Sequence, residues 1–139
     1  MRDREIMNAK RVGQIVERDL TTATISAGRT EIDELKHYYP CIHKAYEEIS
    51  REQFHLFARK MLDYGKSNIS VGSNLDTEEE VHVSLTGLWF RMNDKINRLK
   101  QLVLLKKDAK VKTESVKDTF QDLSIYGIIA QIVSNGNWK

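Results

Sequence analysis

Two charged segments in the C-terminal half of the chain have side chains suited to a phosphate-bearing ligand. In the first, residues 91–98, the charged side chains are Arg91, Asp94, Lys95 and Arg98. Successive residues of a helix are about 100° apart, so these side chains project from neighbouring points. Arginine makes bidentate contacts with phosphate and lysine supplies a compact charge. This segment could hold a polyphosphate and help to ligate its metal. The alternative is a solvated helix face with an Asp94–Arg98 ion pair.

The second segment carries acidic residues at every fourth position, namely Glu114, Asp118 and Asp122. On one helix they form a stripe that drifts by about 40° per step. Further along, the same side becomes apolar at Ile125, Ile129 and Val133, while the opposite side carries Val116, Phe120, Leu123, Gly127 and Ala130. A helix that is apolar nearly all round has to be covered all round, by its own bundle or by a second subunit. Crowded carboxylates at the edge of a covered region favour a cation, and Mg²⁺ takes oxygen ligands together with substrate phosphates.

The elements that position these segments are expected to be helices. Thr30-x-x-Asp33 and Thr77-x-x-Glu80 have the pattern of helix starts, and the only proline, Pro40, should stop or bend the first of these helices. A further helix is predicted from about His43 to Tyr64. Residues 81–86 alternate like a strand, so their assignment stays open.

From residue 86 onward the pattern is helical. Apolar residues fall on one stripe at three- and four-residue spacing: Leu85, Leu88, Trp89, Met92, Ile96, Leu99 and Val103. The last helix is predicted from about Thr113 to Val133, with Thr113 as N-cap. We therefore expect an all-α protein, with a compact bundle of four to five helices at residues 31–139. Residues 1–30 should form an N-terminal helical arm and linker.

Composition narrows the classes of function. The 139 residues fit one domain, and the net charge of +2 lacks the basic excess of a dedicated duplex-DNA binder. Cys41 is the single cysteine, which excludes an intramolecular disulfide, and no apolar run approaches a membrane span. We expect a cytoplasmic protein that does not enter a membrane.

In their order along the chain, three motifs resemble the nucleotide modification associated domain 1 family, which occurs in phages and bacteria. They are Lys60-x-x-Asp63-Tyr64-Gly65, Arg91-x-x-Asp94-Lys95-x-x-Arg98 and Glu114-x-x-x-Asp118-x-x-x-Asp122-x-x-x-Tyr126. The likeness covers roughly residues 43–133. The layout is similar, more distantly, to the all-α nucleoside triphosphate pyrophosphatases of the MazG type.

The resemblance implies a Mg²⁺-dependent enzyme that cleaves a nucleoside triphosphate to the monophosphate and pyrophosphate, and that forms a homodimer or higher homo-oligomer. The implied roles are metal ligation by Asp94, Glu114, Asp118 and Asp122, catalysis by Glu114 and Asp118, and substrate binding by Lys60, Asp63, Arg91, Lys95 and Arg98. Mg²⁺ would lower the pKa of the attacking water, and a spare carboxylate would orient it.

The sequence departs from the MazG pattern in both acidic pairs. The first pair, Glu-x-x-Glu, is replaced by Arg91-x-x-Asp94, and in the second pair Ser115 stands where a glutamate is expected. These replacements favour an alternative, a non-catalytic nucleotide-binding protein or a helical interaction protein associated with DNA modification.

Overall fold

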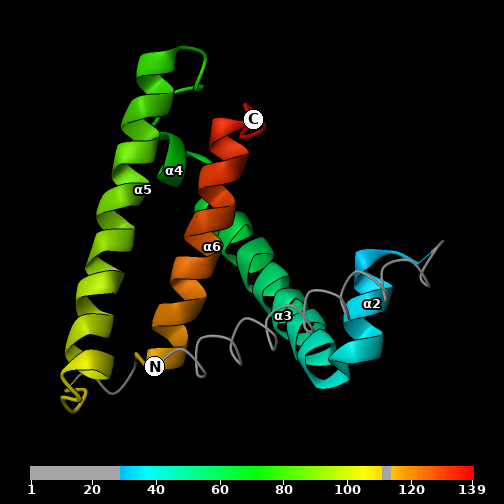
Figure 1. Cartoon of the computed structure of the whole chain (residues 1–139). Helices are drawn as coiled ribbons and strands as arrows, with labels where there is room; N and C mark the ends of the chain where they lie inside the picture. Colours follow the sequence, from blue (N-terminus) through cyan, green and yellow to red (C-terminus); the bar gives the residue numbers. More distant parts are fainter. Residues whose placement is uncertain (1–28, 111–113) are drawn as a thin grey trace, which may run out of the picture. The chain divides into compact units, whose positions relative to one another are not determined.

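The computed structural model describes residues 29–110 and 114–139, and every regular element among them is helical. The elements are α2 (Glu31–Tyr38), α3 (Pro40–Tyr64), α4 (Ser67–Ser70), α5 (Glu78–Leu99), the π-helical turn η1 (Lys100–Leu104) and α6 (Val116–Ser134) (Figure 1). The prediction of an all-α fold is confirmed. Among the described residues, no helix combines the length and the apolar character needed to cross a membrane.

The chain divides into two compact units, Met1–Ile49 and Ser50–Lys139, and the boundary falls inside α3. In the first unit, Thr30 and Asp33 form the predicted capping box at the start of α2. This helix ends before Pro40, which becomes the first residue of α3, a position that tolerates the missing N–H of proline. The predicted arm at residues 1–30 lies almost wholly outside the described residues, so that division stays a prediction.

Two further capping boxes set the starts of the long helices in the second unit. Thr77 and Glu80 begin α5 as predicted, and residues 81–86 continue it as helix. At α6 the N-cap is Ser115, whose side chain accepts a hydrogen bond from the backbone N–H of Asp118. The predicted cap, Thr113, lies outside the described residues. Because α6 begins at Val116, Glu114 precedes the helix, and the expected stripe of three acids on one helix is wrong.

The core of the second unit forms where α5 and α6 pack in opposite directions, with α4 against α5 (Figure 1). Its buried apolar residues are Ile69, Leu88, Ile125, Ile129, Val133 and Trp138. The Ser84 hydroxyl donates a hydrogen bond of 2.7 Å to the carbonyl oxygen of Ile69, which fixes α4 on α5. The side of α6 that continues the acidic residues is therefore the side that enters the core.

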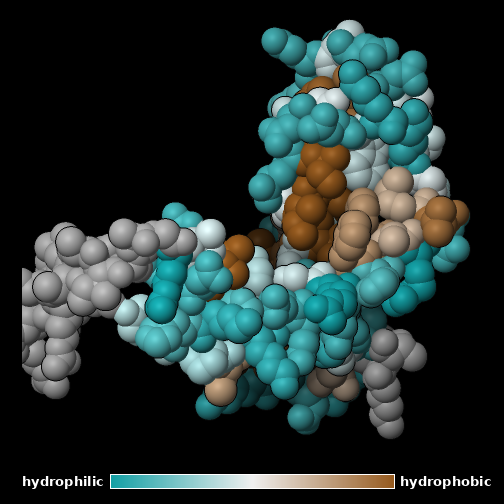
Figure 2. All heavy atoms as spheres, turned by 90° about the vertical axis from the view of Figure 1, so that its right-hand side faces the viewer, coloured by the Kyte–Doolittle hydropathy of each residue, from teal (hydrophilic) through white to brown (hydrophobic). Residues whose placement is uncertain are grey.

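The opposite side of α6 is only partly covered. Phe120, predicted on an apolar side that must be buried, is exposed over about half of its surface, as is Ile128. Figure 2 shows a group of hydrophobic side chains at the surface on the face that it draws. The unit therefore leaves apolar surface that its own helices do not cover.

The apolar stripe predicted on α5 also separates into two faces. Leu88 is buried, and Leu85 and Met92 pack against the core. Trp89 and Ile96 are more than half exposed instead. Residues spaced by three and by four positions spread over a broad arc of the helix surface. The arc of this stripe is wider than the part of α5 that α6 and α4 cover.

Candidate functional site

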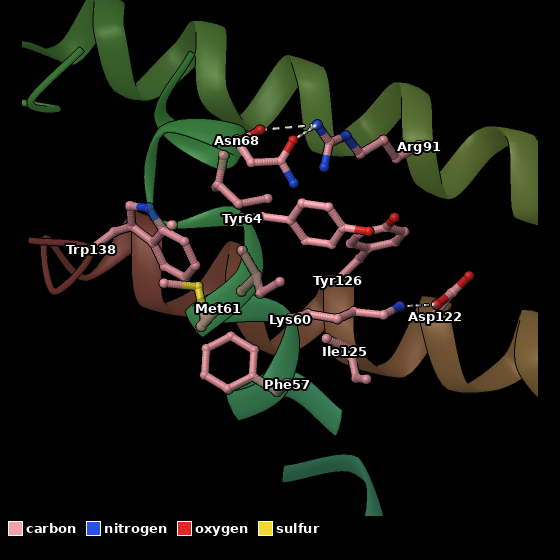
Figure 3. A pocket seen from close by; sticks show the side chains of 13 residues that line it. Phe57, Lys60, Met61, Tyr64, Asn68, Arg91, Asp122, Ile125, Tyr126 and Trp138 are labelled. Carbon is pink, nitrogen blue, oxygen red and sulfur yellow. Dashed lines mark hydrogen bonds and ion pairs between the residues drawn. The ribbon is translucent and has the colours of Figure 1, made fainter. Parts of the chain in front are cut away.

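A pocket of about 330 Å³ lies in the second unit, a size within the usual range of small-molecule sites. Its lining comes from the C-terminal part of α3, from α4, α5 and α6, and from the residues after α6 (Figure 3). Its charged, polar and aromatic lining residues include Lys60, Tyr64, Asn68, Arg91, Asp122, Tyr126 and Trp138.

An ion-pair network with one carboxylate and two lysines borders this pocket. Lys60 Nζ on α3 lies 3.2 Å from Asp122 Oδ1 on α6, and Lys95 Nζ on α5 lies 2.9 Å from Asp122 Oδ2. Asp122 and Lys60 line the pocket, whereas Lys95 approaches the carboxylate from outside the lining. The network therefore joins three helices at one point.

The protonation state of Lys95 follows from this contact. The hydrogen bond to Asp122 raises the pKa of Lys95 above its ordinary value of 10.5, against a smaller opposing effect of burial. Lys95 is therefore a cation throughout the neutral range and compensates the charge of Asp122.

Arg91 adds a further cation to the pocket lining. Its Nη2 donates hydrogen bonds to the backbone oxygen of Asn68 at 2.9 Å and to the Asn68 side-chain oxygen at 3.1 Å (Figure 3). Neither acceptor is charged, and no carboxylate pairs with Arg91 within residues 29–110 and 114–139. Among these residues, the positive charge of the Arg91 guanidinium is therefore not compensated by a carboxylate.

Aromatic side chains form much of the remaining wall. Tyr64 is exposed, Tyr126 is partly buried, and both line the pocket. Trp138 is buried, and its indole N–H donates a hydrogen bond of 3.1 Å to the carbonyl oxygen of Lys66. Its ring also meets Phe57 edge-on, with centroids 6.4 Å apart. The segment after α6 is therefore fixed against the end of α3.

The other residues predicted for the site lie elsewhere. Arg98 pairs with Glu114, with Nη1 at 3.3 Å from the carboxylate and Nη2 donating to the Glu114 backbone oxygen at 2.6 Å. The Asp94–Arg98 pair considered as the alternative is not formed, and Asp94 is exposed. Asp63 is also exposed and does not line the pocket.

Asp118 has a structural partner. Its Oδ2 accepts hydrogen bonds of 2.7 Å from both the hydroxyl and the backbone N–H of Ser115. The side-chain hydrogen bond is the main cause that lowers the pKa of Asp118 below its ordinary value of 3.8. Ser115, which stands where the MazG pattern has a glutamate, therefore has a capping role in this chain.

The structure thus brings together Lys60, Lys95, Arg91 and Asp122 from the predicted set, and places Arg98 and Glu114 in a second pair. Among the residues that it describes, no group of three or more His, Cys, Asp or Glu side chains is placed to hold a metal ion. The predicted metal ligands Asp94, Glu114, Asp118 and Asp122 do not form one cluster.

The sequence prediction missed the aromatic residues and Asn68 as parts of the site. Tyr64 follows Lys60 by four residues, and Tyr126 follows Asp122 by four. In a helix this spacing places each ring on the same face as the charged residue, so the sequence did indicate that the two tyrosines lie beside Lys60 and Asp122. Trp138 lies beyond the last helix, where no periodicity indicates its position.

Comparison of the chain with protein-family models, curated proteins and solved structures gives no match. The resemblance to the nucleotide modification associated domain 1 family stays a prediction.

Proposed function

We propose that the second unit binds a nucleoside phosphate, with a nucleoside triphosphate as the expected ligand. The observation that carries the proposal is the charge beside the pocket, where Lys60, Lys95 and Arg91 are opposed by a single carboxylate, Asp122. Because Lys95 compensates Asp122, the pocket lining itself keeps a surplus of positive charge. An anionic group is the complement of such a lining.

The cationic lining residues suit the phosphates of a nucleotide, and the aromatic lining residues suit its base. Lys60 and Arg91 supply donors that form charge-assisted hydrogen bonds with phosphate oxygens. The exposed ring of Tyr64 offers a surface for stacking with a base, a contact that contributes about 1–3 kcal/mol per base when proteins bind single-stranded nucleic acids. Base and phosphate therefore find complementary groups within one pocket.

Magnesium-dependent pyrophosphohydrolysis, the activity expected from the resemblance, would be the catalytic form of this proposal. Mg²⁺ commonly uses one or two carboxylates and completes its shell with water and substrate phosphates. Of the four predicted metal ligands, Asp122 alone lines the pocket, and it is already paired with two lysines. This donor set does not fit a resident magnesium ion, so nucleotide binding is the function that the geometry supports best.

The test measures binding of ribo- and deoxynucleoside triphosphates by isothermal titration calorimetry, with and without Mg²⁺, and pyrophosphate release in parallel samples. We expect binding in the wild type and a loss of about tenfold or more in Lys60→Gln and in Arg91→Gln, because each removes a charge-assisted hydrogen bond. Arg59→Gln is the matched control, since Arg59 is exposed on the same helix and outside the pocket lining.

Each outcome decides between the functions. Binding that the pocket variants weaken and the control does not supports the proposal, and pyrophosphate release in addition would extend it to the predicted hydrolase. Absence of binding to every nucleotide, or equal losses in Arg59→Gln and Lys60→Gln, would overturn it. Arg91→Gln also removes the hydrogen bonds to Asn68, so its unfolding curve is measured to show whether the fold is destabilised. A loss of nucleotide affinity without a loss of stability is then due to the missing contact with the ligand.

A further inference from the structure

Helix α5 carries apolar residues that its own unit leaves uncovered. Trp89 and Ile96 on α5, together with Val103 in the adjoining η1, are termed here the α5 strip and are 56%, 55% and 45% exposed. Trp89 and Ile96 are seven residues apart, which keeps them on one side of α5 with a drift of only about 20°. Val103 follows in the π-helical turn η1. Trp89 also makes an edge-to-face contact with the exposed Phe90, with ring centroids 5.1 Å apart. Large apolar side chains that lie exposed close together often mark an interaction site.

The charges at the two ends of the strip have opposite signs. The first turn of α5 contains Glu78 and Glu79, both exposed. Beyond η1, at the other end, lie the exposed Lys106 and Lys107. A surface that is acidic at one end, apolar in the middle and basic at the other end is complementary to itself when one copy is turned end to end.

We infer that the α5 strip is covered by the α5 strip of a second copy of this chain, packed antiparallel about a two-fold axis. In the register that pairs apolar residues, Trp89 of one copy lies opposite Ile96 of the second copy, and the reverse contact forms by symmetry. The antiparallel arrangement also brings the acidic first turn of α5, with Glu78 and Glu79, toward the end of the second copy that carries Lys106 and Lys107. Such an isologous contact closes as a dimer.

The structure also changes the reason for expecting an oligomer. In the sequence, the apolar run at residues 125–133 had to be covered by its own bundle or by a second subunit. Its main members, Ile125, Ile129 and Val133, are buried in the core of their own unit. They are therefore unavailable for a partner, whereas the α5 strip is exposed.

Sedimentation velocity over a range of micromolar concentrations tests the interface first. We expect a dimer for the wild type and a dissociation constant raised about 30-fold or more in Trp89→Glu and in Ile96→Glu, because a charge would be placed at the centre of the contact. The control is Leu62→Glu, which places the same charge at a highly exposed apolar position on α3. Circular dichroism establishes that each variant stays helical.

A charge exchange then tests the antiparallel direction. Glu78→Lys with Glu79→Lys forms one variant, and Lys106→Glu with Lys107→Glu forms the other. Each alone places like charges opposite each other and should weaken the dimer at low salt, whereas an equimolar mixture should restore it as a heterodimer. A wild-type monomer at every concentration, a dimer that survives Trp89→Glu, or a mixture without recovery would each overturn the proposed arrangement.

Discussion

Replacing Asp122 with asparagine separates the structural use of this carboxylate from a role in binding a metal. The substitution removes the negative charge that holds Lys60 and Lys95 together. The Lys60 side chain is 45% exposed, so this pair contributes about 0.5 kcal/mol, as surface pairs do. Lys95 is 23% exposed and forms the shorter contact, for which about 1.5 kcal/mol is typical of a hydrogen bond between charged groups. We expect the free energy of unfolding to fall by about 2 kcal/mol.

The affinity for a nucleotide should change in the opposite direction. A phosphate bound to Lys60 would lie about 6 Å from the Asp122 carboxylate, since the ammonium group between them is 3.2 Å from that carboxylate and about 2.8 Å from its phosphate partner. At this distance, repulsion between unit charges amounts to about 0.7–1.4 kcal/mol for effective dielectric constants of about 80 to 40. Asp122→Asn should therefore bind a nucleotide about three- to tenfold more tightly.

Two measurements on the same variant check these expectations, urea unfolding for stability and calorimetric titration with a nucleoside triphosphate in the absence and presence of Mg²⁺. Asp63→Asn is the matched control, because Asp63 is exposed and outside the pocket lining. Weaker binding by the folded Asp122→Asn protein, above all a loss confined to samples with Mg²⁺, would refute the reasoning. That result would identify Asp122 as a metal ligand, as the sequence resemblance implies.

Further predictions concern the capping box, pH and the C-terminal segment. Ser115→Ala should lower the free energy of unfolding by about 1 kcal/mol, measured in urea, because Asp118 N–H loses its acceptor at the start of α6. The lowered pKa of Asp118 stabilises the fold above pH 3.8, and this contribution should disappear as the pH falls through the lowered value; acid titration by circular dichroism should show that Asp118→Asn lacks it. The raised pKa of Lys95 gives a contribution that is complete below pH 10.5 and is lost as the pH rises through the raised value, so Lys95→Met should reduce the alkaline dependence of the melting temperature. Trp138→Phe keeps a ring in the core but removes the donor to the Lys66 carbonyl oxygen, which should cost about 1 kcal/mol in urea; an unchanged value would show that this hydrogen bond adds nothing to stability.

The fold class could be predicted because local signals and helical periodicity agree along most of the described residues. Thr77 with Glu80, and Thr30 with Asp33, mark helix starts that the structure retains. The start of α6 was predicted two residues too early. Thr113 and Ser115 are both suitable caps, and the choice depends on Asp118 three residues after Ser115. Periodicity could not indicate which part of the α5 stripe would be buried, because that depends on where α6 and α4 pack.

The candidate site was predicted only in part, for a related reason. Helical spacing correctly placed Arg91, Lys95 and Arg98 on one side of α5. It could not show that their partners would be Asn68, Asp122 and Glu114, which come from three other segments. Partners across helices depend on packing and register between elements, and a single sequence carries no direct signal for either.

The chain contains two tryptophans in contrasting surroundings, Trp89 exposed on α5 and Trp138 buried beside the pocket. Each is therefore an intrinsic fluorophore located at one of the two proposed binding surfaces. Emission from a Trp138→Phe protein would report on the α5 strip alone, and emission from a Trp89→Phe protein on the pocket alone. Self-association and nucleotide binding can thus be followed separately by intrinsic tryptophan fluorescence, without an attached label.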